Sequence, residues 1–304
     1  MSIHPTATVE AGARLGADVH IDAFCLVGAD VELGDGCRLH SRVSITGHTR
    51  VGAGCEFFPG AVIGCIPQDV KYHGEMSKLE IGQRNVFREL VTVHPGTAGG
   101  GSVTRIGDGN LFLIGAHIAH DCTVGNGCIL ANYAQLAGHV VVEDYVTFGG
   151  QCGVHHFVSI GKHAFIGGMT PVNTDVPPFM VFSASRSQSQ GSPIRVRFVN
   201  RVGLQRHGFT QEQIGALTGT YMRLYSRRAR VNGISIHTTV DDILADPTVE
   251  ENVEYLCRFL KRTFAHGRHG RYLESLRQDR RSSPSAPPNE DAVAVAGDDG
   301  RTPR

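Results

Sequence analysis

The segment AHIAHDCTVGN, residues 116–126, combines two histidines three residues apart with an aspartate directly after the second. An imidazole that titrates near neutrality can take a proton from a hydroxyl group and return it to a leaving group, and a neighbouring carboxylate can hold its tautomer. His120 and Asp121 could therefore be a general base and its partner, ligands of a metal ion, or polar residues of a turn. The surrounding sequence distinguishes these interpretations.

An apolar residue recurs at every sixth position around this segment. From Ile3 to Val172, Ile, Val, Leu or Phe occupies all 26 such positions, with interruptions at residues 65–80 and 96–105. Six residues at about 100° each would spread these side chains around a helix, whereas positions i and i+4 of a strand share one face. The repeat therefore predicts short strands that form a triangular solenoid, in which each coil packs on its neighbours.

The repeat also predicts the packing role of the cysteines and the direction in which the His120 ring points. The fourth residue after each apolar position is mostly small, and six of the eight cysteines stand there, which predicts compact apolar packing rather than disulfides or metal binding. His120 lies between the two inward positions of its hexad, so its ring is expected to point away from the core. Loops 65–80 and 96–105 leave the regular array and are the expected places for function.

Composition excludes several classes of protein. The chain carries 29 basic and 29 acidic residues, so its charge favours neither general nucleic-acid binding nor attraction to a membrane surface. The segment MSIHPTATVE lacks the features of a signal peptide, and no run of 18 apolar residues occurs. We expect a soluble, cytoplasmic protein with no integral membrane segment and no nucleic-acid partner.

The period changes after residue 178. Residues 179–197 are expected to form an irregular linker, 198–278 an α-helical C-terminal domain, and 279–304 a disordered tail. One helix should begin at Thr210 with Gln213 as its capping-box partner, and another at Asp246-Pro247. The apolar face of the first contains Ile214, Leu217, Tyr221 and Leu224.

The repeat and its interruptions resemble the hexapeptide-repeat acyltransferases, and among them the UDP-N-acetylglucosamine acyltransferase family. The segments that carry this resemblance stand in the family's order: PQDVKYHGE (67–75), VTVHPGTAGGGSVTRIG (91–107), AHIAHDCTVGNGCILAN (116–132), LAGHVVVEDY (136–145) and DVPPF (175–179). The resemblance implies an all-β catalytic domain over residues 1–178, a left-handed parallel β-helix, followed by the small helical domain.

The resemblance also implies roles for individual residues. His120 matches the general base, Asp121 its partner, and the backbone N–H of Gly138 the donor to an oxyanion. Gly168 matches the far end of the acyl-chain channel, which Met169 beside it could shorten. The positions that match substrate-binding residues are Asp69, Lys71, His117, His139, His155, His156, Asn200 and Arg206.

The implied reaction moves a fatty acyl chain, of the 3-hydroxyacyl type, from acyl carrier protein to the 3-position of UDP-N-acetylglucosamine, the first step of lipid A biosynthesis. The acyl chain arrives on the phosphopantetheine of the carrier protein, and the enzyme needs no cofactor or metal of its own. A homotrimer is expected, because a single prism offers no enclosed pocket at an outer surface. Residues 195–281 contain 16 Lys or Arg against 9 Asp or Glu, which fits docking of an acidic carrier protein.

Some positions depart from the familiar members of the family. His156 stands in place of a glutamine, the linker is longer, and Val202 and His207 replace an acidic and a basic residue. Three alternatives therefore stay open: a sibling acyltransferase with another acyl donor or an amino-sugar acceptor, a zinc carbonic-anhydrase-like enzyme using the histidines as ligands, and a non-catalytic scaffold. Acyl-chain length and the choice between UDP-N-acetylglucosamine and its 3-amino analogue are not fixed by the sequence.

Overall fold

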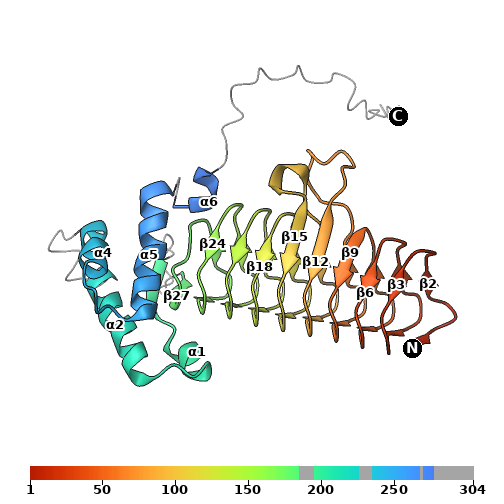
Figure 1. The fold of residues 1–304 in the computed structure, drawn as a ribbon, viewed down its shortest axis with the longest axis horizontal. Coiled ribbons are helices and arrows are strands. Elements are labelled where there is room, and N and C mark those ends of the chain that lie inside the picture. Colours follow the sequence, from red (N-terminus) through yellow and green to blue (C-terminus); the bar gives the residue numbers. More distant parts are fainter. Residues whose placement is uncertain (185–194, 226–234, 268–269, 277–304) are drawn as a thin grey trace, which may run out of the picture.

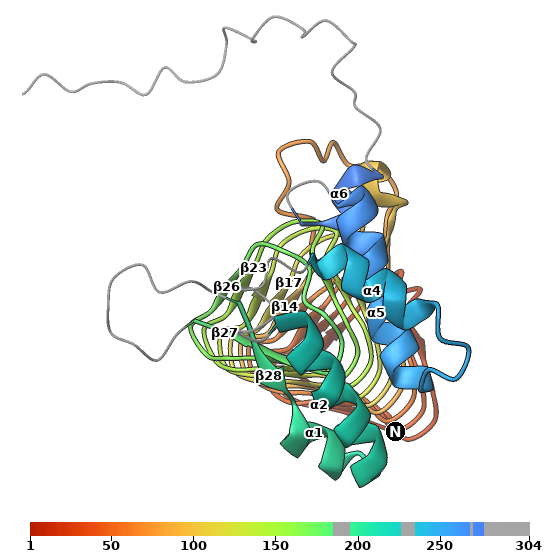
Figure 2. The same cartoon turned by 90° about the vertical axis from the view of Figure 1, so that its left-hand side faces the viewer.

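The repeating hexads form three parallel sheets that wind into a left-handed β-helix. The computed structural model describes residues 1–184, 195–225, 235–267 and 270–276. Figure 1 shows the coils stacked along one long axis with the helices at the C-terminal end, and Figure 2 shows the triangular cross-section. This confirms the solenoid that the six-residue period predicts.

Each sheet takes one strand from every coil, and we call the sheets A, B and C in the order in which the chain visits them. Sheet A contains β1 (Ser2–Ile3), β4 (His20–Ile21), β7 (Arg38–Leu39), β10 (Glu56–Phe57), β13 (Val86–Phe87), β16 (Leu111–Phe112), β19 (Ile129–Leu130), β22 (Thr147–Phe148), β25 (Phe165–Ile166), β27 (Met180–Ser183) and β28 (Arg195–Val199). Sheet B contains β2 (Thr8–Val9), β5 (Leu26–Val27), β8 (Ser44–Ile45), β11 (Val62–Ile63), β14 (Thr92–Val93), β17 (His117–Ile118), β20 (Gln135–Leu136), β23 (Gly153–Val154) and β26 (Pro171–Val172). Sheet C contains β3 (Arg14–Leu15), β6 (Glu32–Leu33), β9 (His48–Val51), β12 (Lys78–Ile81), β15 (Val103–Ile106), β18 (Thr123–Val124), β21 (Val141–Val142) and β24 (Ser159–Ile160).

The corners between strands follow one pattern, and we name each edge of the prism by the sheets that it joins (A–B, B–C and C–A). The third residue after a strand is left-handed at most corners, with φ of 60° at Asp121, 58° at Tyr133 and 59° at Tyr145. The first and third residues donate their N–H to a neighbouring coil, as Ala137 does to Val154 and His139 to His120. The N–H of the second residue is left out of this ladder, so each corner in which this residue is not proline offers one donor to a side chain or a ligand.

The inward positions are filled as expected. Phe57, Phe87 and Phe112 stack in sheet A with ring centroids 4.8 Å apart at each step. The six cysteines of the repeat are buried, and each thiol donates to a carbonyl of the next coil, for example Cys122 Sγ to Ala137 O at 3.1 Å. A thiol therefore fills the small position and supplies one weak hydrogen bond across the stack.

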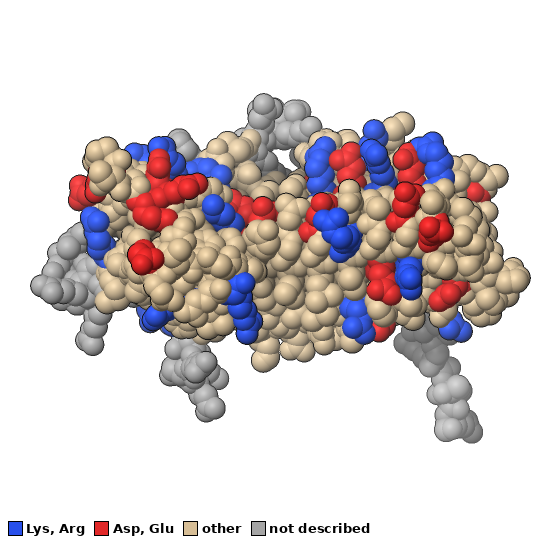
Figure 3. Space-filling view, turned by 60° about the horizontal axis from the view of Figure 1, so that its bottom comes forward, with Lys and Arg blue, Asp and Glu red and all other residues tan. Residues whose placement is uncertain are grey.

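Charged side chains lie outside the prism. Figure 3 shows positive and negative side chains alternating in a row over the N-terminal coils. On sheet C, Glu32 pairs with Arg14 and with Arg50, and Arg105 pairs with Glu80 at 3.2 Å. Neighbouring coils thus place opposite charges side by side, which supports the register of the ladder.

The region after the prism differs from the expected linker. Within residues 179–197, β27 pairs in parallel with β25 and antiparallel with β28, so both strands extend sheet A. The apolar run that begins at Phe179 explains this, because Phe179, Met180 and Phe182 are buried against the last coils. Residues 185–194 and the expected disordered tail lie outside the described residues.

The described helices are α1 (Arg201–Arg206), α2 (Gln211–Tyr225), α4 (Ile236–Leu244), α5 (Glu251–His266) and α6 (Tyr272–Ser275), with a short 3-10 helix, η1 (Ala98–Gly100), in the second loop. The capping box is confirmed, since Thr210 Oγ1 accepts from Gln213 N and Gln213 Oε1 accepts from Thr210 N. Helix α5 begins at Glu251, later than expected. The Asp246 side chain instead accepts from Thr248 in a turn, and Glu250 caps the helix through Val253 N. No helix in the described ranges combines the length and apolar character needed to cross a bilayer.

Candidate active site

The two loops and the His-Asp pair lie on the same edge of the prism. The first loop follows β11 and the second follows β14, so each loop replaces a corner between sheets B and C. His120 follows β17 and occupies the same corner in the next coil. Figures 1 and 2 show both loops rising from this edge, and Ala98 N in the second donates to Glu75 Oε1 in the first at 3.2 Å. The B–C edge is therefore where the solenoid departs most from its repeat.

His120 and Asp121 form a closely hydrogen-bonded pair. His120 Nδ1 lies 2.8 Å from Asp121 Oδ2, so Nδ1 carries the proton that Asp121 accepts, and Nε2 keeps its lone pair for another partner. The ring points away from the core as expected, yet His120 is only 7% exposed because the loops cover it. The hexad pattern does not predict this cover. The arrangement is that of a base whose orientation is fixed by a carboxylate.

The second loop holds the carboxylate of this pair. Thr97 N donates to Asp121 Oδ1 at 2.8 Å, and Thr97 Oγ1 donates to Asp121 Oδ2 at 2.6 Å. Burial alone would raise the pKa of Asp121, but the hydrogen bonds from His120 and Thr97 outweigh it and leave the pKa below the ordinary value. Asp121 therefore stays ionised although its side chain is fully buried.

Gly138 stands directly beside the imidazole in the next coil. It occupies the second corner position after β20, the same position that His120 occupies after β17. A Cβ at Gly138 would lie 2.5 Å from His120 Cε1, so only glycine leaves room for the ring. Within the described residues the Gly138 N–H has no backbone acceptor, and it is available to an oxygen that approaches His120.

The first loop brings an acidic residue to the other side of the ring. Asp69 Oδ2 lies 3.8 Å from His120 Nε2, and Asp69 Oδ1 accepts from Lys71 N at 3.0 Å, which closes a tight turn. Lys71 itself is exposed at the loop surface. A hydroxyl group that approaches Nε2 would thus meet Asp69 as well, with a cationic side chain nearby in the same loop.

Further histidines line the same edge. His139 Nε2 lies 3.8 Å from Asp121 Oδ2, and its ring stands perpendicular to that of His120 at 5.2 Å. His117 Nδ1 lies 2.7 Å from Thr92 Oγ1, and burial together with neighbouring His94 and His120 lowers the pKa of His117 to about 4. His117 is therefore neutral at pH 7 and can donate or accept a hydrogen bond without adding charge.

His94 belongs to this group but was not singled out from the sequence. It is 6% exposed, its Nδ1 donates to Cys65 O at 2.9 Å, and its Nε2 has no partner among the described residues. The ring centroid lies 5.3 Å from that of His117. The segment VTVHPGT, which precedes the second loop, contains this histidine, and its place one coil before His117 is the signal that could have identified it.

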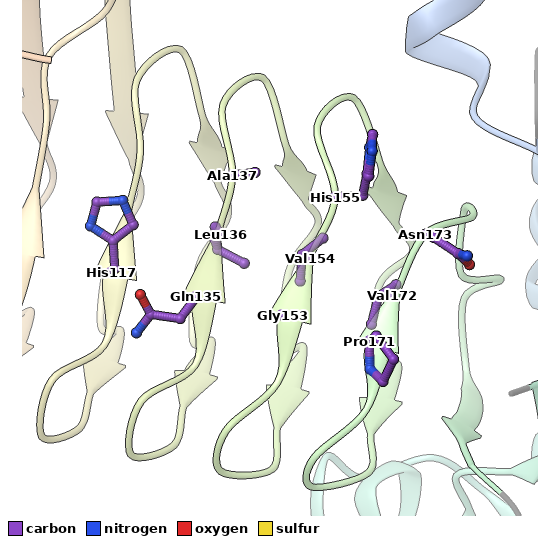
Figure 4. Close-up of a pocket in the computed structure, with 10 residues that line it drawn as sticks. All are labelled: His117, Gln135, Leu136, Ala137, Gly153, Val154, His155, Pro171, Val172 and Asn173. Atoms are coloured by element: carbon purple, nitrogen blue, oxygen red, sulfur yellow. The ribbon is translucent and has the colours of Figure 1, made fainter. Parts of the chain in front are cut away.

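A shallow groove of ≈ 380 Å³ runs from this edge over sheet B. Figure 4 shows its residues on β17, β20, β23 and β26 and the corners that follow. A side chain at Gly153 would meet no atom within 4 Å, so the missing side chain opens the middle of the groove. His155 lies at the edge, exposed like His156 beside it. The lining residues are His117, Gln135, Leu136, Ala137, Gly153, Val154, His155, Pro171, Val172 and Asn173.

Four of the expected site residues lie on other edges of the same chain. Gly168 and Met169 follow β25 on the A–B edge, and Met169 is 67% exposed. Arg206 is the last residue of α1 and Asn200 is its N-cap, and α1 lies beside the C–A edge. There Asn200 caps α1 by accepting from Gly203 N, and its Nδ2 donates to His163 O. One chain by itself does not bring these residues to His120.

His207, one of the departures from the familiar pattern, has a structural contact. His207 Nδ1 lies 3.0 Å from His163 Nδ1, and Tyr145 stacks on the His163 ring at 4.9 Å. Burial, with the nearby His207 and Lys162, lowers the pKa of His163 to about 4. The pair joins α1 to the β-helix, because one neutral ring can donate to the other.

One group of the described residues has the spacing of a metal site. Ligand atoms of His120, Asp121 and His139 lie within 4.8 Å of one another. The two oxygens of Asp121 already accept three hydrogen bonds at 2.6–2.8 Å, from His120 and twice from Thr97. The donor set therefore fits a hydrogen-bonded catalytic pair better than a cluster of three histidines of the carbonic-anhydrase kind.

Comparisons with known proteins identify related sequences and structures. Residues 175–270 match the family model for UDP-N-acetylglucosamine O-acyltransferase, domain 2, and residues 12–47 and 104–138 match the model for the bacterial transferase hexapeptide (six repeats). A crystal structure of a UDP-N-acetylglucosamine acyltransferase is 37% identical, with a TM-score of 0.77, over 85% of this chain and 95% of that one. The corresponding enzyme from Campylobacter jejuni is 34% identical, with a TM-score of 0.76, over 85% and 95%. That from Bacteroides fragilis is 33% identical, with a TM-score of 0.78, over 85% and 96%.

The fold and the site define a hexapeptide-repeat transferase, an enzyme that transfers an acyl group. Within that class, the chain belongs to the UDP-N-acetylglucosamine acyltransferase family. The resemblance found in the sequence is thereby confirmed, as is the left-handed β-helix with its C-terminal helices.

Proposed function

We propose that this protein transfers a 3-hydroxyacyl chain from acyl carrier protein to the 3-hydroxyl of UDP-N-acetylglucosamine, the first step of lipid A biosynthesis. The observation that supports it most is the B–C edge, where a buried His-Asp pair, an unpaired glycine N–H and an acidic loop residue meet around one nitrogen atom, His120 Nε2. Family membership supports the acceptor.

His120 acts as the base in this proposal. As the 3-oxygen attacks the thioester carbonyl, its proton passes to Nε2, and Asp121 stabilises the imidazolium through Nδ1. The negative charge that develops on the carbonyl oxygen is met by the Gly138 N–H. When the tetrahedral intermediate collapses, the carbon–sulfur bond breaks and the thiolate of phosphopantetheine takes the proton from His120. The base is thus regenerated, and no cofactor of the enzyme is needed.

Asp69, His139, His117, His155 and His156 are proposed to bind the acceptor and the reacting groups. Asp69 faces Nε2 and can accept from a sugar hydroxyl, while Lys71 suits a phosphate. The groove on sheet B suits an acyl chain, because its floor contains Leu136, Val154 and Val172.

A homotrimer is proposed to complete the site. Asn200, Arg206, Gly168 and Met169 lie on edges other than that of His120, so they can join His120 only if another copy supplies them. A copy placed beside the B–C edge would also close the open side of the groove. Light scattering at assay concentrations should give three times the chain mass, and a monomer with full activity would contradict this.

Docking of the carrier protein is proposed on the helical domain. The basic excess of residues 195–281 would attract an acidic partner over about 10 Å at 0.1 M salt and over about 3 Å at 1 M. Three arginines of this region, Arg227, Arg228 and Arg230, lie outside the described residues. We expect kcat/KM for the carrier protein to fall steeply with salt, and their charge reversal to raise KM with little change in kcat. Neither change would occur if docking lies elsewhere.

Mass spectrometry of the product tests the reaction itself. The purified chain would be incubated with UDP-N-acetylglucosamine and 3-hydroxyacyl carrier proteins of several lengths, in parallel with acetyl-CoA and with the 3-amino acceptor. An O-acylated product with one preferred chain length, formed by the wild type and lost in His120→Ala, supports the proposal. A product only from acetyl-CoA or only from the 3-amino acceptor would assign a sibling reaction instead.

A further inference from the structure

The second loop has a feature that acyl transfer does not by itself explain. Thr97 stands at the N-cap of η1, with φ −128° and ψ 159°, but its side chain makes no capping hydrogen bond to this helix. Its hydroxyl turns instead to Asp121 Oδ2, and its N–H to Asp121 Oδ1. A residue type that commonly caps a helix is used here to hold a carboxylate.

The rest of the loop is shaped to the same carboxylate. A Cβ at Gly100 would lie 2.1 Å from Asp121 Cγ, so the backbone of η1 rests directly on the carboxyl group. Asp121 N donates to Thr104 Oγ1 at 2.8 Å, where the loop rejoins sheet C. Thr97 and Asp121 are 5% and 8% exposed, so water does not compete freely for these contacts. The loop surrounds the carboxylate on the sides that His120 does not cover.

These contacts determine how Asp121 can act. A buried carboxylate without donors would favour its neutral form, and a neutral carboxyl group could itself donate to His120 and reverse the tautomer. Thr97 supplies one donor to each oxygen, and Oδ2 accepts in addition from His120 Nδ1 at 2.8 Å. The lone pair of the base is then at Nε2, on the side of Asp69 and Gly138.

We propose that Thr97 is a positioning residue of the catalytic site, and that the second loop serves to keep Asp121 ionised and correctly oriented beneath His120. This inference rests on the proposed role of His120 as the base, and it assigns to the loop a task within the chain rather than contact with substrate. Thr97 acts through Asp121 and touches no reacting atom.

The test compares Thr97→Val, which keeps the shape but removes the hydroxyl donor, with Thr97→Ser, which restores that donor. Thr49→Val is the matched control, because Thr49 is also buried, its hydroxyl donates to Thr46 O at 2.7 Å and it makes no hydrogen bond to His120 or Asp121 among the described residues. In Thr97→Val we expect kcat to fall roughly tenfold or more with little change in KM for UDP-N-acetylglucosamine. The acidic limb of the kcat/KM profile should move to higher pH. Thr97→Ser should recover most of the wild-type kcat and of the wild-type pH profile. Thr49→Val should change neither kcat nor the pH profile.

A measurement without substrate separates this inference from the proposed function. Carbon-13 NMR titration of the Asp121 carboxyl group in the full chain should show a higher pKa in Thr97→Val than in the wild type, and a near wild-type pKa in Thr97→Ser. If Thr97→Val leaves both the pKa of Asp121 and the pH profile unchanged, the positioning role is wrong even when the wild type is active. If the pKa rises but the wild type forms no O-acylated product, the proposed function fails and the loop contact stands.

Discussion

The C–A and B–C edges of the prism are built from the same corner but use it differently. At several corners of the C–A edge, the N–H of the second corner residue is taken by a side chain from a neighbouring coil. Asp35 accepts from Ala17, Asp108 from Gln83, Asn126 from Asp108 and Asp144 from Asn126, all at 2.7–2.8 Å. At Gly138 on the B–C edge the same N–H has no such partner, and histidines stand in place of the acceptors. The B–C edge can use its N–H in the same way, since Ala29 N donates to Glu10 Oε2 at 3.0 Å, but at Gly138 the donor is left for a ligand.

This difference shows how a repeat protein can acquire a reactive site. The regular corner supplies a left-handed residue and, where its second residue is not proline, an N–H that the backbone ladder does not use, without any special sequence. A corner can then become a reactive site when the side chain that would accept its N–H is absent and titratable side chains stand in its place. Loops must also exclude water from these side chains. Both insertions fall on the B–C edge, in the coils directly before His120.

The largest effect should come from removing the base. In His120→Ala, kcat should fall by about 10²–10⁴-fold, because a positioned base contributes a factor of this size. The β-helix should remain folded, since the His120 ring is outside the core. Steady-state kinetics with a circular dichroism spectrum checks both, and a variant that retains more than about a tenth of wild-type kcat would remove His120 from this role.

A smaller loss is expected in Gly138→Ala. The added methyl would lie 2.5 Å from His120 Cε1, so the ring must shift although the N–H donor remains. We expect kcat to fall by about 10–100-fold, a typical result of a displacement near 1 Å. Gly215→Ala in α2 is the control, because its methyl would meet no atom within 4 Å. Equal kcat in the two variants would mean that Gly138 is not packed against the base during turnover.

On the C–A edge the expected effect concerns stability rather than turnover. Asn126→Ala removes the acceptor for Asp108 N and a donor to Asp144, which should lower the free energy of unfolding by about 1 kcal/mol. Catalysis should stay within about twofold of wild type, since within the chain both partners lie on a different edge from His120 and neither is among the proposed site residues. Denaturant unfolding and kcat measure the two effects. A large loss of activity at unchanged stability would contradict the division between the edges.

The smallest effect should appear as a pH dependence of stability at the histidine of the C–A edge. Because the pKa of His163 is about 4 in the folded protein, the unfolded chain binds a proton near pH 6.5 while the folded chain does not. Its contribution to stability is therefore constant above about pH 6.5 and is lost as the pH falls towards 4. In His163→Phe, which keeps a ring on Tyr145, the decrease in melting temperature between pH 7 and pH 5 should be smaller than in wild type. If the decrease in melting temperature is the same in His163→Phe as in wild type, titratable groups other than His163 cause it.

Much of the fold could be predicted because the six-residue period repeats a single packing rule. The inward residues, the cysteine positions and the capping box at Thr210 follow from local chemistry that the sequence states directly. The linker could not be predicted in the same way, because β27 and β28 form only by pairing with the last coil. The sequence predicts too early a start for α5, since Asp246 resembles a cap but forms a separate turn.

The sequence predicts which residues gather around His120 only in part, and it does not predict how they are enclosed. His120, Asp121, Gly138 and Asp69 meet as the resemblance implies. The burial of His120 and the contacts of Thr97 depend on how a glycine-rich loop folds back, and no periodicity encodes that path.

The most direct test of the account asks whether the B–C edge acts as one catalytic unit. Asp121 should serve only through His120, so kcat of the double variant His120→Ala/Asp121→Asn should equal that of His120→Ala alone, even though Asp121→Asn by itself lowers kcat strongly. Single-turnover rates of the wild type and the three variants at one pH give the complete cycle. If the loss in the double variant is the product of the two single losses, Asp121 and His120 contribute independently, and the paired base described here is wrong.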